Sequence, residues 1–149
     1  MLTSLAGLAR FRSMPFGEDM RNIRGFATII ALANFAVAVW HLYLVEKLHP
    51  AAPIAESVYI AAFAGALTLA GVALVWMRRQ KIGSLVLIVV FTIGLVVGSS
   101  EHFFITGPNN VFDVGNGDWA LLFKISVAIL VLLEVAGLSV SGRMLAARS

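Results

Sequence analysis

Four apolar runs, each long enough to cross a lipid bilayer, constrain this sequence more than any other feature. A membrane-spanning helix needs about 20 mostly apolar residues, and the sequence provides such runs at about 25–45, 57–77, 82–104 and 119–141. Hydrophobic residues make up 60% of the chain and charged residues 13%, whereas a soluble domain has about half and about a quarter. We therefore predict an all-α integral membrane protein.

Short polar segments separate the runs and make consecutive spans antiparallel. The first break carries Pro50 and Pro53, the second is a charged RRQK turn, and the third is the glycine-rich loop ITGPNNVFDVGNGD. Proline ends helices because it lacks a backbone N–H donor. The sequence predicts one four-transmembrane-helix, up-down-up-down bundle over residues 23–149. A cytoplasmic tail, residues 1–22, precedes it and is expected to be disordered or interfacial.

The basic residues predict which side of the membrane each end faces. Nine of the 11 Lys and Arg side chains fall before the first run, between the second and third, or after the fourth. Such residues concentrate on the cytoplasmic side, so we expect both termini there, in a plasma or inner membrane. The distribution argues against a nucleic-acid partner. The expected partners are the lipid bilayer and either further copies of the chain or a larger membrane complex.

The sequence carries no recognisable catalytic motif. It has no cysteine, which excludes disulfides, c-type haem attachment, thiolate-bound iron–sulfur clusters and a Cys nucleophile. It also has no phosphate-binding loop, dinucleotide fingerprint or matched nucleophile and base. Nothing in it therefore indicates an enzyme.

Two polar residues are expected near the middle of the membrane. Asn34 lies in the first run and Glu134 in the fourth, and because these spans run in opposite directions their depths should be similar. An ionised carboxylate in lipid needs a partner, and Asn34 is the nearest candidate in depth. We consider two interpretations: a proton relay through Glu134 and Asn34, or a buried Glu134 that is simply hydrogen-bonded to Asn34.

The histidines fall on the outer half of the predicted bundle. His102 follows Gly98 by four residues, so it continues the small-residue stripe of Gly94 and Gly98, which is typical of a helix–helix contact. It should therefore face the bundle at the level of His41, while Glu101 lies about 100° away around the helix. The sequence leaves open whether the two rings converge. Each histidine can also be interpreted as an ordinary packing residue. Glu101 can likewise be interpreted as a residue at the boundary of its helix.

If the rings do converge, the pair has a possible chemistry. Two imidazoles can hold b-type haem axially. With a carboxylate such as Glu101, His41 and His102 can instead bind a divalent transition metal. No ligand-spacing motif supports either interpretation.

The fourth run begins with two further polar residues. Asp118 is expected to be the N-cap of its helix. Lys124 lies about five residues inside the membrane, where its long side chain is expected to extend to the headgroups. The alternative for Lys124 is an ion pair with Glu101.

Three functions fit these features. The first is a non-enzymatic accessory or assembly subunit of a membrane complex. The second is an oligomeric, proton-linked carrier or channel that uses Glu134 and Asn34. The third is a haem- or metal-binding redox protein that uses His41 and His102. We rank them in that order, because sparse polar residues and small-residue faces suit helix association more directly than either chemistry.

Overall fold

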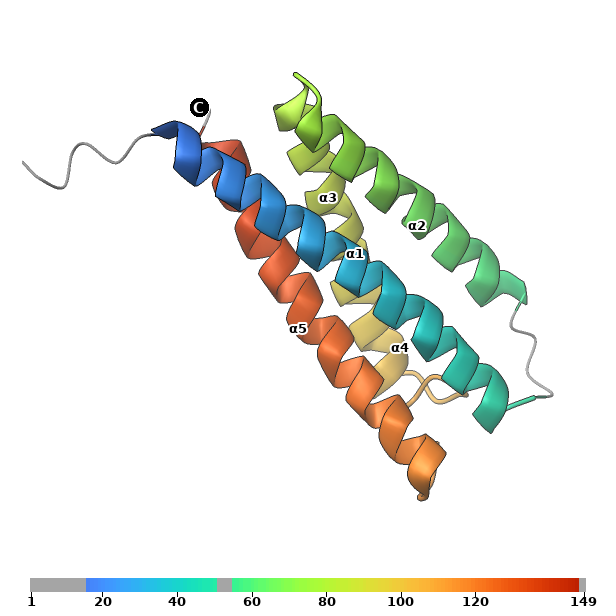
Figure 1. The fold of residues 1–149 in the computed structure, drawn as a ribbon. Coiled ribbons are helices and arrows are strands. Elements are labelled where there is room, and N and C mark those ends of the chain that lie inside the picture. The colour runs from blue at the N-terminus through green and yellow to red at the C-terminus, as the bar shows by residue number, and fades with distance from the viewer. Residues whose placement is uncertain (1–15, 51–54, 148–149) are drawn as a thin grey trace, which may run out of the picture.

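The computed structural model describes residues 16–50 and 55–147, and all regular structure in them is helical. The prediction of an all-α protein is therefore confirmed for these residues. Figure 1 shows the arrangement of the helices: α1 (Phe16–Leu48), α2 (Ala55–Trp76), α3 (Gln80–Ile93), the π-helical turn η2 (Gly94–Gly98), α4 (Ser99–Phe103) and α5 (Asp118–Ala146).

Within residues 16–50 and 55–147, three helical runs are long and apolar enough to cross a membrane. They are Met20–Leu48, the continuous run Gln80–Phe103 and Asp118–Ala146. They coincide with the first, third and fourth predicted spans. The second predicted span coincides with α2, whose described apolar stretch, Ala62–Trp76, is shorter. The structure thus supports a membrane protein, while the four-span bundle stays a prediction.

The helix α1 begins earlier in the sequence than the apolar run that it contains. No proline occurs between Phe16 and Leu48, so nothing stops the helix on the polar side of the run, and Pro50 follows its end. Residues 16–22, which the sequence assigns to the tail, are therefore helical. The rest of the predicted tail, residues 1–15, lies outside the described part of the chain.

The packing is organised around α5. Both α1 and α3 pack against it, and α2 packs against α3 and α1 (Figure 1). Two clusters of buried apolar side chains fill the interior. The first cluster comprises Leu44, Val45, Val111, Val114, Ala120, Phe123 and Val127. The second cluster comprises Ala27, Ala31, Val75, Leu87, Phe91 and Met144.

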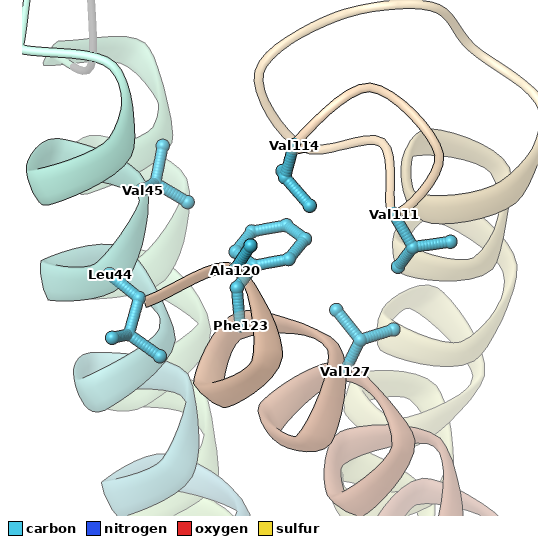
Figure 2. Close-up of a cluster of buried hydrophobic side chains, with 7 residues drawn as sticks. All are labelled: Leu44, Val45, Val111, Val114, Ala120, Phe123 and Val127. Atoms are coloured by element: carbon cyan, nitrogen blue, oxygen red, sulfur yellow. The ribbon is translucent and has the colours of Figure 1, made fainter. Parts of the chain in front are cut away.

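The loop between α4 and α5 folds back onto the helices. Figure 2 shows its residues Val111 and Val114 together with side chains of α1 and α5 in the first cluster. Gly115 and Gly117 have φ angles of 69° and 129°, which side-chain-bearing residues rarely adopt. Gly117 also occupies the N-cap of α5, without a side-chain cap hydrogen bond. The prediction of Asp118 as N-cap is therefore wrong, because the helix begins at Asp118 itself.

Close contact between α2 and α3 depends on Gly83. A Cβ atom at this position would lie 2.5 Å from the backbone nitrogen of Val75 and 2.8 Å from the carbonyl oxygen of Gly71. Backbone atoms cannot rotate away as a flexible side chain can. Any residue larger than glycine must therefore push the two helices apart.

We predict that Gly83→Ala destabilises the protein by about 1–3 kcal/mol, the usual cost of overpacking. Gly142→Ala is the matched control, because a Cβ there meets no atom within 4 Å and alanine is favoured over glycine in a helix by about 1 kcal/mol. Thermal unfolding in detergent should show a lower Tm for Gly83→Ala and an unchanged or higher Tm for Gly142→Ala. Equal Tm values for the two variants would contradict the close approach of α2 and α3.

Candidate functional site

The structure brings His41 and His102 together. His41 on α1 and His102 on α4 are each 6% exposed, and their ring centroids lie 4.8 Å apart with the ring planes at 73°. Phe123 of α5 packs against the His41 ring at a centroid distance of 4.7 Å. Three helices that are distant in sequence therefore meet at this pair, which we call the histidine pair.

The contact of His41 with α5 fixes which of its ring nitrogens carries a proton. His41 Nδ1 and Ser126 Oγ are 2.8 Å apart, and Ser126 Oγ donates its only proton to the Phe123 carbonyl oxygen at 2.7 Å. Ser126 can therefore only accept from His41. Nδ1 of His41 must be the donor, and in the neutral ring Nε2 then carries a free lone pair.

The second ring is fixed by the loop. His102 Nδ1 lies 2.8 Å from the carbonyl oxygen of Asn109. A carbonyl has no proton to give, so Nδ1 of His102 is again the donor. The loop is held in place by a backbone bond from Val111 N–H to the His102 carbonyl at 3.0 Å. Both rings are thus oriented by the same kind of hydrogen bond.

The Nε2 atoms of the two rings have different surroundings. Nε2 of His41 is buried and has no hydrogen-bond partner among the described residues. The Cδ2–Nε2 edge of the His102 ring lies 3.9 Å from the place where a Cβ of Gly98 would be. A buried polar atom without a partner costs about 1–3 kcal/mol. The histidine pair therefore presents one buried lone pair, on His41, for which the described chain supplies no donor.

The histidine pair borders an apolar part of the interior. Phe123 contacts both rings and belongs to the first cluster, with contributions from α1, α5 and the α4–α5 loop (Figure 2). Glycine at position 98 leaves room beside the His102 ring, in the π-helical turn that precedes α4. Single π-turns within α-helices are frequent at functional sites. The surroundings limit the access of water to both rings.

Glu101 does not join the histidine pair. Its Oε2 accepts a bond from Asn109 Nδ2 at 3.1 Å, on the side of the helix that faces the loop. No group of three or more His, Cys, Asp or Glu side chains positioned to hold a metal occurs in the part of the chain that the structure describes. A metal ion here would have two protein imidazoles and open positions for water or other donors.

A haem between the two rings does not fit this geometry. Axial ligands on opposite faces of a haem iron have ring centres roughly 6 Å apart. The centroids of His41 and His102 are 4.8 Å apart, and the edge of one ring meets the face of the other. There is no space for a porphyrin between them.

Glu134 and Asn34 are not hydrogen-bonded to each other in the structure. The Glu134 side chain is 7% exposed, and its carboxyl group packs against Gly94 of η2, where a Cβ would overlap it. Asn34 Oδ1 is buried and has no hydrogen-bond partner. Similar depth alone did not bring the two groups together, because the rotation of each helix also decides where its side chains point.

Lys124 bonds to the loop and not to Glu101. Its Nζ donates to the carbonyl oxygen of Gly115 at 3.1 Å. This hydrogen bond connects the α4–α5 loop to α5, near the beginning of the helix. This contact is consistent with a side chain that extends toward the membrane surface.

Two residues that orient the histidine pair were not foreseen from the sequence. Ser126 is an isolated hydroxyl in an apolar run, three residues after Phe123, and this spacing could have placed it near the packed face of the helix. Asn109 acts mainly through its backbone carbonyl, which no sequence pattern identifies. The chain matches no protein-family model, no curated protein and no solved structure. Its function is therefore inferred from the site itself.

We predict that both histidines of the metal-free protein are Nδ1–H tautomers near neutral pH. Ser126→Ala removes the acceptor for His41 and should release only that ring, while His102 keeps its bond to the Asn109 carbonyl. Imidazole ¹⁵N chemical shifts of the labelled protein distinguish the tautomers. An Nε2–H tautomer at either ring of the unaltered protein would contradict the hydrogen-bond assignment.

Proposed function

We propose that the protein is a small multi-pass membrane protein that binds a divalent transition-metal ion through His41 and His102. One observation carries the proposal. Two buried imidazoles from different helices are in contact, their Nδ1 atoms are engaged in hydrogen bonds, and Nε2 of His41 is buried without a partner. Metal-binding histidines almost always donate the other ring N–H to a protein or water acceptor, which fixes the ring orientation.

The distance between the rings supports a shared ion. A metal–nitrogen bond of about 2 Å puts a ring centre roughly 3 Å from the ion, so two rings at a tetrahedral angle have centres roughly 5 Å apart. The centroid distance of 4.8 Å is close to this value. Imidazole suits zinc, copper, iron and nickel. With two protein ligands, the remaining positions go to water or to donors from another protein.

The orientation in the membrane is part of the same proposal. We place four spans in a plasma or inner membrane with both termini cytoplasmic. The reason is that Arg24 precedes the first apolar run, Arg78 and Arg79 lie between the second and third, and Arg143 follows the fourth. The histidine pair then lies near the outer surface under the α4–α5 loop. A metal-binding subunit is compatible with a place in a larger membrane complex, whose other members supply further ligands.

We predict that the purified protein binds one Zn²⁺ or Co²⁺ ion per chain. His41→Gln and His102→Gln should each weaken binding by about tenfold or more, because each removes one of two ligands. His49→Gln is the matched control. Nε2 of His49 is also buried without a hydrogen-bond partner, but within the described residues its ring makes no ring contact with either member of the pair. Calorimetric titration with Zn²⁺ and the visible spectrum of Co²⁺ measure the effect. Equal affinity in all three variants would contradict the proposal.

A second candidate function, proton-linked transport, is favoured by the position of Glu134. Its carboxyl group lies against Gly94, and His102 Nε2 lies beside Gly98, so the two groups follow one glycine stripe about one helical turn apart. Polar groups along such a line can pass protons through intervening water. Four helices leave little room for a path within one chain, so this function requires an oligomer.

For the second candidate, we predict that Glu134→Gln abolishes proton flux into liposomes that contain the protein. Glu101→Gln is the matched control, because it removes a carboxylate that is bonded to Asn109 outside the stripe. A pH-sensitive dye inside the liposomes measures the flux under an imposed potential. A flux that survives Glu134→Gln would remove this candidate and leave metal binding unaffected.

A further inference from the structure

Two hydrogen-bond donors without acceptors lie at the other end of the molecule, where α1 meets the start of α3. Gln80, the first residue of α3, is 1% exposed, and its Oε1 accepts a bond from Arg24 Nη2 at 2.6 Å. Gln80 Nε2 and Arg24 Nε are buried, and neither has a partner among the described residues. Both atoms are N–H donors, so a group that satisfies either of them must be an acceptor. Of the two residues, only Gln80 also lines the adjacent hollow.

A hollow beside Gln80 is surrounded by positive charge. Its volume is about 300 Å³, and it is lined by Arg78, Arg79, Gln80, Lys81 and Ile82. The three cationic residues of this lining are exposed at its rim. The hollow is therefore large enough for a phosphate group and carries the opposite charge.

The start of α3 adds backbone donors to the same place. The first N–H groups of a helix have no partner within the helix and favour a nearby anion. Arg79, at the N-cap, makes no side-chain capping bond, and the first turn of α3 contains no acidic residue. No carboxylate of the first turn therefore competes with a bound anion.

We propose that this hollow binds the phosphate group of an anionic phospholipid. Arg79 and Lys81 supply the charge, and the α3 N-terminus and the Gln80 amide supply the hydrogen bonds. A lipid is favoured over a free anion because exposed apolar side chains continue from the hollow along α2 and α3. Trp76, Met77, Ile82 and Leu85 are all exposed and offer a surface to acyl chains.

This site is independent of the histidine pair. It lies at the opposite end of α1, where Arg24 and His41 are separated by more than four helical turns, or roughly 25 Å. In the proposed orientation it faces the cytoplasmic leaflet, where anionic lipids attract basic segments. Loss of metal binding and loss of lipid binding can therefore be measured separately in the same protein.

The test compares full-length protein in nanodiscs of phosphatidylcholine with and without phosphatidylglycerol. Native mass spectrometry counts retained lipids, and thermal unfolding reports stabilisation. We expect retained phosphatidylglycerol and a higher Tm for the unaltered protein. The double variant Arg79→Gln, Lys81→Gln should lose about tenfold or more of this preference. The control is the double variant Arg21→Gln, Arg143→Gln, which removes the same amount of charge outside the hollow. It should keep the preference for phosphatidylglycerol.

A single substitution tests the proposal if the double variant does not fold. Gln80→Glu is nearly isosteric and still offers an acceptor to Arg24, but it places a negative charge beside the phosphate. It should therefore remove the preference for phosphatidylglycerol. Equal losses in the hollow and control double variants, or an unchanged preference in Gln80→Glu, would overturn the proposal. Saturable binding of inorganic phosphate without any preference for phosphatidylglycerol would overturn the lipid assignment.

Discussion

The hydrogen bond from His41 to Ser126 is the interaction on which the candidate site depends. It joins α1 to α5 inside an apolar region, where few other polar contacts are available to fix the rotation of either helix. Because Ser126 passes its own proton to the Phe123 carbonyl, the bond also decides the tautomer of His41. Nε2 of this ring is buried without a partner, and the ring lies against that of His102. One contact between two helices thus bears on the packing of α1 against α5, on the orientation of the His41 ring and on which of its nitrogens can bind a ligand.

Much of the fold could be predicted from the sequence because hydrophobic length and periodicity are strong signals. The apolar runs coincide with the helices, and the step from Gly98 to His102 correctly placed that ring on a packed face. Other contacts could not be predicted from the sequence. Asn34 and Glu134, expected at a similar depth, are not hydrogen-bonded to each other, and Lys124 bonds to a loop carbonyl that no pattern identifies. Depth follows from position in the sequence, whereas rotation and loop geometry follow from tertiary packing.

Buried polar groups are hydrogen-bonded differently at the two ends of the structure. At the histidine pair, each ring satisfies one nitrogen within the protein and leaves the other as an acceptor. At the start of α3, the Arg24–Gln80 pair satisfies one acceptor and leaves N–H donors. Unused acceptors suit a cation and unused donors suit an anion. The same reasoning therefore assigns a metal ion to one end and a phosphate group to the other.

The central claim is that both imidazoles bind the same ion, and X-ray absorption of the zinc-loaded protein tests it most directly. The account predicts two imidazole nitrogens at about 2.0–2.1 Å from zinc, with oxygen donors in the remaining positions. In His102→Gln the imidazole contribution should fall to a single ring. A spectrum with no imidazole scattering, or one that is unchanged in His102→Gln, would contradict the account.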